Sequence, residues 1–129
     1  MTNRSSIQAH KESALDFLQL VMAGSIDEAY ESYVNMHGRH HNVYFSAEFS
    51  SLKRGMLEDH AQFPDKRLIV KNILSQGDQV MVHSHLIMKQ GEPGRTVVHI
   101  FRFEKGKIVE LWDVGQVIPL DSPNRIGAF

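Results

Sequence analysis

Hydrophobic positions near the start of the chain recur at the spacing of an α-helix. Ser5 and Ser6 precede a broad apolar stripe, which Gly24 follows. Ser25 then precedes a second apolar face in the segment SIDEAYESYV. Serine is a favoured N-cap, and glycine commonly follows the last turn of a helix. The pattern therefore predicts two helices packed as a hairpin. The first stripe consists of Ile7, Ala14, Leu15, Phe17, Leu18, Val21 and Met22.

The hydrophobic period changes from helical to alternating at Pro64. Just before it, SSLKRGMLEDHAQF predicts a short third helix, whereas residues 35–50 show no sustained period. After it, alternation predicts strands at about 68–75, 79–89, 96–104 and 107–117. Because the connections are too short for helical crossovers, the sheet should be largely antiparallel. Helices followed by such a sheet predict one α+β domain over residues 1–129.

Alternation within the last two predicted strands places a histidine and a carboxylate among apolar neighbours. In TVVHIFRFE, His99 shares a face with Phe101, and in KIVELWDVGQ, Asp113 shares a face with Leu111. If both faces lie under the helices, the imidazole is one of the few partners that could keep a buried carboxylate ionised. A structural alternative is that Asp113 pairs with a backbone amide and His99 is a core histidine with satisfied hydrogen bonds.

Histidine is concentrated at two places that suggest metal binding. MHGRHHNVYF holds His37, His40 and His41 within five residues, and His83 and His85 form an HxH pair. Two histidines at this spacing share one strand face and can chelate one metal ion. The G-x5-H-x-H spacing resembles the first half of the cupin metal motif, but the glutamate and the second half are absent. A metal-dependent, cupin-like enzyme using His83 and His85 is therefore a secondary alternative.

Composition narrows the class of protein further. Among 129 residues, 14 are basic, 15 are acidic and none is cysteine. This balance, without blocks of like charge, gives no electrostatic footprint for nucleic acid or an anionic membrane. The absence of cysteine excludes disulfides, thiolate metal sites and a cysteine nucleophile. Without a signal-peptide pattern or a long apolar run, we expect a cytoplasmic protein that binds neither nucleic acid nor membrane.

The C-terminal segment VVHIFRFEKGKIVELWDVGQVIPLDSP resembles the signature of SnoaL-like proteins, the polyketide-cyclase branch of the nuclear transport factor 2-like superfamily. HHN at 40–42 and SLKRGM at 51–56 also match this family. The resemblance implies a cone in which three N-terminal helices pack on a curved, mostly antiparallel sheet and enclose a pocket. It also implies homodimers formed through the sheet, with His83 and His85 on its back. No cofactor is expected.

The family resemblance also implies roles for individual residues. Asp113 matches the acid–base aspartate of SnoaL-type cyclases, His99 matches an oxyanion-binding position of ketosteroid isomerases, and His41 matches a position directed toward the pocket. The lead hypothesis is acid–base chemistry, an aldol-type cyclisation or an isomerisation next to a carbonyl, on a small hydrophobic molecule. A non-catalytic ligand-binding protein is the alternative. The expected ligand-binding residues are Asn42, Tyr44, Met56, Val82, Phe101 and Leu111.

Overall fold

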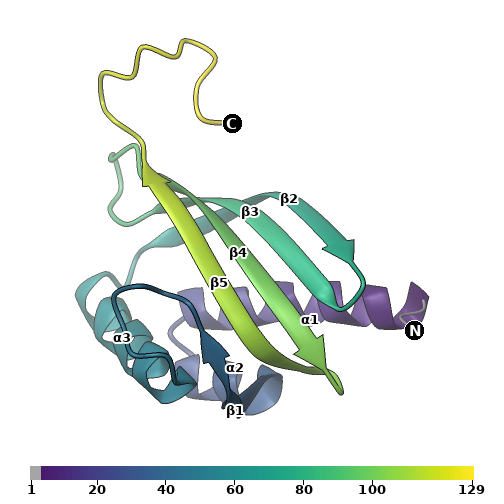
Figure 1. Ribbon diagram of the computed structural model, residues 1–129. Coiled ribbons are helices and arrows are strands. Elements are labelled where there is room, and N and C mark those ends of the chain that lie inside the picture. Colours follow the sequence, from purple (N-terminus) through teal and green to yellow (C-terminus); the bar gives the residue numbers. More distant parts are fainter. Residues whose placement is uncertain (1–3) are drawn as a thin grey trace.

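The computed structural model describes residues 4–129, and all three predicted helices are present in it (Figure 1). They are α1 (Arg4–Met22), α2 (Ile26–Tyr33) and α3 (Phe49–Gln62). Helix α1 begins at Arg4, so Ser5 and Ser6 lie inside its first turn rather than before it. Ser25 stands at the N-cap position of α2, but its side chain makes no capping hydrogen bond. The helix positions were therefore predicted better than the helix starts.

A five-stranded mixed sheet follows the order β1-β5-β4-β3-β2 and is not closed. The strands β2 (Arg67–Gln76), β3 (Gln79–Ile87), β4 (Arg95–Glu104) and β5 (Lys107–Val117) form the predicted antiparallel meander. The additional strand β1 (Val34–His40) pairs in parallel with β5. The sequence pattern did not predict β1, because only its two end residues are buried and its pairing shifts register between Val34 and Arg39.

The hydrophobic core lies between the helices and one face of the sheet. In Figure 1, α1 runs across the sheet, and α2 and α3 contact β1. The predicted alternation is confirmed in β3, where Val80, Val82 and Ser84 are buried. The Phe17 ring packs edge-on against those of Tyr30 and Phe101, with centroids 5.5 and 5.9 Å apart. Aromatic side chains from α1, α2 and β4 therefore meet in the core.

A β-bulge near the start of β5 changes which residues face the core. Arg102 pairs with Glu110, but the next residue on β4, Phe103, pairs with Ile108, so Val109 is an extra residue. Alternation along KIVELWDVGQ predicts that Ile108 shares the outer face with Glu110 and Trp112, and this prediction is wrong, because Ile108 is fully buried in the core. Beyond the bulge alternation holds, so Glu110 faces outward and Asp113 faces the helices.

The outer face of the sheet carries a row of apolar side chains across four strands. Leu74 pairs with Met81, Met81 with Ile100, and Ile100 with Trp112. Leu74 and Met81 are 65% and 40% exposed. None of the helices in the described residues is both long and apolar enough to cross a membrane.

Candidate functional site

Asp113 and His99 face each other directly across β5 and β4, so the two faces to which alternation assigned them lie on the same side of the sheet. Directly opposed residues have Cβ atoms about 4.5–5.5 Å apart. Both side chains are half-buried, and the His99 Nδ1 atom is inaccessible to solvent and has no hydrogen-bond partner within the described chain. Burial lowers the pKa of His99, and the nearby Asp113 charge opposes that effect only in part. His99 is therefore a neutral imidazole beside a carboxylate.

Asn42 supplies the hydrogen bond to the Asp113 carboxylate. Its Nδ2 donates to Asp113 Oδ2 at 2.9 Å, although the two residues are 71 positions apart in sequence. Its Oδ1 accepts a hydrogen bond from the Tyr44 backbone N–H at 3.0 Å, which fixes the direction of the amide group. The structure thus brings Asn42 to Asp113 and gives it a definite role there, that of a donor to the carboxylate.

Tyr30 also lies close to Asp113, which the sequence pattern did not predict. It sits on the buried face of α2, and its hydroxyl donates to the Met56 sulfur at 3.2 Å. Burial, and secondarily the negative charge of Asp113, raise the pKa of Tyr30, so the phenol keeps its proton. Because a thioether sulfur is only a weak hydrogen-bond acceptor, the Tyr30 hydroxyl can donate instead to a stronger acceptor. The sequence indicated only that Ile26, Ala29 and Tyr30 share the apolar face of this helix.

Ser84 adds a second polar side chain without a partner on the inner face. It is fully buried, and its Oγ makes no hydrogen bond within the described residues. It lies on β3 two residues from Val82, which pairs with His99. Because buried polar atoms are nearly always hydrogen-bonded, Ser84 Oγ and His99 Nδ1 are unusual groups on this part of the inner face.

The expected apolar wall consists of core residues. Val82, Phe101 and Leu111 are at most 2% exposed and belong to the same core cluster, and Met56 packs against that cluster. They give the polar group an apolar surrounding in which hydrogen bonds and charges act strongly. Tyr44 is different, because it is 87% exposed and does not belong to this core cluster.

His41 lies on the opposite face of the sheet from Asp113, contrary to the expectation that it points into the pocket. Its ring stacks on Trp112, with centroids 4.9 Å apart, and its Nε2 lies 2.6 Å from Glu110 Oε2. The His41 N–H bonds to the Leu111 carbonyl, which continues the strand geometry beyond β1. Neighbouring residues in extended backbone point to opposite sides, so Asn42 takes the inward position.

His41 belongs instead to an ionic cluster around Glu110, whose side chain is 7% exposed. Arg39 Nε and Arg102 Nε donate to the Glu110 carboxylate at 2.9 and 3.0 Å. Burial by itself would raise the pKa of Glu110, but hydrogen bonds from His41, Arg102 and Arg39 together lower it to about 2. This cluster ties β1 and β4 to β5 on the outer face.

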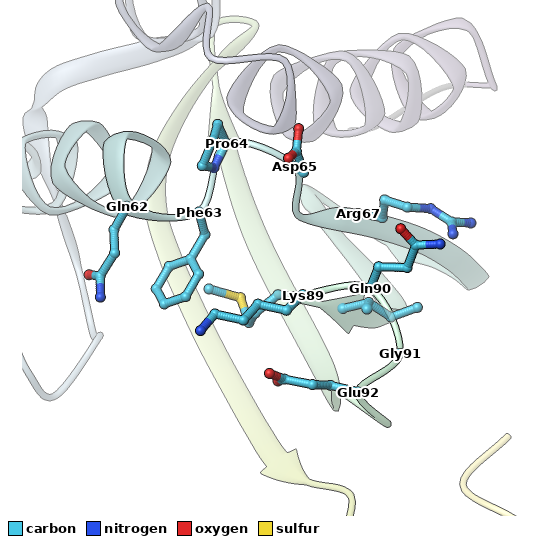
Figure 2. A pocket seen from close by; sticks show the side chains of 11 residues that line it. Gln62, Phe63, Pro64, Asp65, Arg67, Lys89, Gln90, Gly91 and Glu92 are labelled. Atoms are coloured by element: carbon cyan, nitrogen blue, oxygen red, sulfur yellow. The ribbon is translucent and has the colours of Figure 1, made fainter.

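Two cavities in the described structure lie away from Asp113. One, of about 540 Å³, opens between the end of α3, the start of β2 and the β3–β4 loop, with Phe63, Lys89 and Glu92 around it (Figure 2). The other, of about 410 Å³, lies between α1 and β2. Neither is lined by Asp113, His99, Asn42 or Tyr30. The polar group around Asp113 is therefore distinct from both cavities.

The HxH pair lies on the outer face, as the family resemblance implied. His85 Nε2 is 2.7 Å from the Pro93 carbonyl oxygen, and His83 Nδ1 is 3.3 Å from Asn72 Nδ2. Both histidine rings pack near the Phe129 ring. Within residues 4–129, no group of three or more histidine or acidic side chains could hold a metal ion. Neither histidine therefore has the set of neighbours that the cupin-like alternative requires.

Comparison with known proteins relates most of the chain to one family. The family model described as the SnoaL-like domain matches residues 16–111. No curated protein matches significantly. A candidate SnoaL-like polyketide cyclase from Jannaschia sp. CCS1 has 18% identity and a TM-score of 0.72, covering 90% of this chain and 92% of its own.

Two Streptomyces structures are similar in the same way. AclR from Streptomyces galilaeus, described as a candidate hydroxylase, has 22% identity and a TM-score of 0.72, covering 89% of this chain and 83% of its own. IdmH from Streptomyces antibioticus, described as a candidate polyketide cyclase, has 17% identity and a TM-score of 0.68, covering 83% and 91% respectively. At these identities the likeness establishes the fold.

Proposed function

Because the chain belongs to the SnoaL-like domain family, we propose that it is a small-molecule enzyme that performs acid–base chemistry next to a carbonyl group. The observation that carries the proposal is the Asp113 carboxylate, held by the Asn42 amide and facing the half-buried imidazole of His99. Two similar structures are described as candidate polyketide cyclases, which favours ring closure as the reaction.

The reaction begins with proton transfer to Asp113. The carboxylate removes a proton from the carbon next to the carbonyl, and the electrons of the C–H bond move to form an enolate, with negative charge on oxygen. Preorganised donors at that oxygen lower the barrier. Tyr30 O–H and a ring N–H of His99 are the two neutral donors beside Asp113. Neither needs to lose its proton for this role.

The second half of the reaction returns the proton from Asp113. In an isomerisation, the protonated carboxyl delivers it to a different carbon of the same substrate. In an aldol-type cyclisation, the enolate carbon forms a bond to a second carbonyl carbon of the same molecule, and the proton goes to the resulting alkoxide. In both cases the substrate is a small hydrophobic carbonyl compound, because apolar core residues surround the polar group.

The proposal is tested by hydrogen–deuterium exchange at carbon. The protein is incubated in D₂O with a panel of cyclic ketones and β-keto esters, and loss of the proton next to the carbonyl is followed by ¹H NMR. We expect Asp113→Asn to slow exchange by about 10²- to 10⁴-fold, the usual contribution of a general base. Asp121→Asn, the same change at an exposed position, should leave the rate unchanged.

The same experiment separates catalysis from simple ligand binding. Equal exchange rates for wild type and Asp113→Asn would remove Asp113 as the proton-transferring group. If a panel compound binds, as seen by chemical-shift changes, but no variant accelerates exchange above buffer, the non-catalytic ligand-binding alternative is favoured. The unpartnered atoms of Ser84 and His99 would serve a bound ligand equally well in that case.

A further inference from the structure

His40 is buried beside the site but has no part in the chemistry proposed above. It is 3% exposed and ends β1, next to Phe49 at the start of α3. Both ring nitrogens have partners. Nδ1 accepts a hydrogen bond from the Asn42 backbone N–H at 3.0 Å, and Nε2 lies 2.6 Å from the Ser46 carbonyl oxygen.

These two partners determine the protonation state of the His40 ring. A backbone N–H only donates, so Nδ1 must present a lone pair to Asn42. A carbonyl oxygen only accepts, so Nε2 must carry the hydrogen that points to Ser46. A neutral imidazole with its proton on Nε2 satisfies both requirements. A proton on Nδ1 would point at the Asn42 backbone N–H, and because both groups are donors the hydrogen bond to Asn42 would be lost.

The ring of His40 therefore connects two parts of the loop of residues 41–47. The backbone N–H of His40 also donates to the Ala47 carbonyl at 3.0 Å, and the Phe45 N–H donates to the Asn42 carbonyl at 3.3 Å. Asn42 is thus held through its own backbone N–H, and Tyr44 orients its side-chain amide. The remaining Asn42 donor, Nδ2, is the one that reaches Asp113.

We propose that His40 is a positioning residue, which keeps the Asn42 amide on the Asp113 carboxylate by holding the loop as a neutral, Nε2-protonated imidazole. It acts through Asn42 and does not touch the substrate. The geometric part of this proposal stands independently of any reaction. Its effect on turnover rests on the function proposed above for Asp113.

The first test is structural and uses the wild-type chain. Long-range ¹H–¹⁵N correlation spectra of the uniformly ¹⁵N-labelled protein at neutral pH should show His40 with its proton on Nε2 and an unprotonated Nδ1. The side-chain amide hydrogens of Asn42 should exchange slowly with solvent. A proton on Nδ1, or an imidazolium, would overturn the proposal without any mutation.

Two substitutions then separate holding the loop from filling space. His40→Leu removes both ring contacts, and Asn42 amide exchange should accelerate at least roughly tenfold, toward the rate of an exposed amide. His40→Asn keeps an acceptor near the Nδ1 position and should restore most of the protection. His37→Leu removes an exposed histidine of the same strand and should change nothing. Unchanged Asn42 exchange in folded His40→Leu would overturn the proposal.

Turnover gives an independent readout with the most active ketone of the panel. In His40→Leu we expect kcat to fall roughly 10- to 100-fold, as expected when a catalytic group is displaced by about 1 Å, with KM changed less than about threefold. His40→Asn should recover most of kcat. Equal losses of kcat in the two variants would indicate general loosening and contradict the proposal. If the wild type shows no turnover, the proposed function fails, and the Asn42 exchange measurement still decides the role of His40.

Discussion

Around Asp113, the neighbouring ionisable groups are held in their neutral forms. Burial raises the pKa of Tyr30 and lowers that of His99, so the first keeps its proton and the second does not gain one. When the pKa values of neighbouring titratable groups are pushed apart in this way, the groups take different roles in proton transfer. In the proposed reaction, Asp113 is then the group that takes and returns a proton, and its two neutral neighbours donate hydrogen bonds.

Removing the Tyr30 hydroxyl should weaken turnover with little loss of stability. In Tyr30→Phe the ring keeps its packing against Phe17 and Phe49, and only the weak bond to the Met56 sulfur is lost. The free energy of unfolding should change by less than about 1 kcal/mol. The exchange rate at carbon should fall about 10²-fold, as for loss of one oxyanion donor. Urea denaturation and the D₂O assay measure the two quantities.

Tyr44→Phe is the matched control for Tyr30→Phe. The Tyr44 side chain is 87% exposed, so loss of its hydroxyl should affect neither stability nor exchange. If Tyr44→Phe lowers the exchange rate as much as Tyr30→Phe does, the assignment of the donor to Tyr30 is wrong. The expectation that Tyr44 binds ligand would then gain support despite its exposure.

The Glu110 cluster predicts an acid-sensitive contribution to stability. The pKa of Glu110 falls from 4.5 to about 2 on folding, so its stabilising effect is present above pH 4.5 and is lost as the pH falls toward 2. Because Arg39 and His41 are partly exposed, we expect Glu110 to contribute only about 1–3 kcal/mol to the free energy of unfolding. Urea denaturation at pH 5.5 and pH 2.5 should show a smaller difference for Glu110→Gln than for wild type.

The matched control is Glu104→Gln, which changes an exposed carboxylate that also pairs with Arg102. Its unfolding free energy should follow the wild-type dependence on pH. An equal flattening in both variants would mean that the acid sensitivity belongs to the surface charge as a whole rather than to Glu110.

Residue faces were predictable from the sequence only where the strand itself was predictable. His99 and Asp113 were each grouped with the correct apolar neighbours, because period-2 alternation determines which side chains of one strand share a face, whereas their direct opposition depends on the register between strands. His41 and Asn42 were not separated, because they follow a strand that the pattern did not reveal. Ser84 and Tyr30 occupy inward positions of recognised elements, but a sequence does not state whether a buried hydroxyl finds a partner.

At the scale of elements, the close contact between β1 and its neighbours depends on Gly38. A Cβ atom at this position would collide with the Val109 carbonyl and with the Phe49 ring. Backbone atoms of the neighbouring strand have little freedom to move away. Gly38→Ala should therefore lower the free energy of unfolding by about 1–3 kcal/mol, measured by urea denaturation.

Gly115→Ala is a suitable comparison, because Gly115 also lies in a strand and a Cβ there would meet one carbonyl oxygen at 3.1 Å. We expect a smaller loss of stability than for Gly38→Ala. Equal losses in the two variants would show that β1 can move away from β5 and that its close approach is not required.

Two features of the sheet could not be predicted from hydrophobic periodicity, for the same physical reason. β1 buries only its ends, and the bulge at Val109 inserts one residue into an otherwise regular alternation. In both places the conformation is imposed by partner strands and by packing rather than by the local pattern. The helices and the four-stranded meander were predictable, because each has a sustained apolar face of its own.

At the scale of the whole molecule, we propose that a second copy of the chain covers the outer face of the sheet. The support is the continuous apolar row Leu74, Met81, Ile100 and Trp112, two members of which are well exposed. Light scattering after size exclusion should give a dimer mass for wild type and a monomer mass for Met81→Glu. Leu120→Glu, a charge added to the exposed C-terminal segment, should remain dimeric.

A monomeric wild type at micromolar concentration would contradict the dimer proposal directly. A dimer that persists in Met81→Glu would instead place the interface elsewhere on the molecule. Stable interfaces bury about 1,200 Å² or more in total. An interface of that size centred on this row would bury residue 81, and an unpaired charge buried there should disrupt the association.

The parallel pairing of β1 with β5 has a consequence for how the protein folds. The β2–β5 meander joins neighbours in sequence, whereas Val34 pairs with Ile108 and Asn42 reaches Asp113 across 71 residues. Contacts between distant residues form slowly, because a long loop must close before they are gained. During synthesis β1 therefore cannot pair until β5 has been made, and the Asp113 carboxylate acquires its Asn42 partner only when these two strands come together.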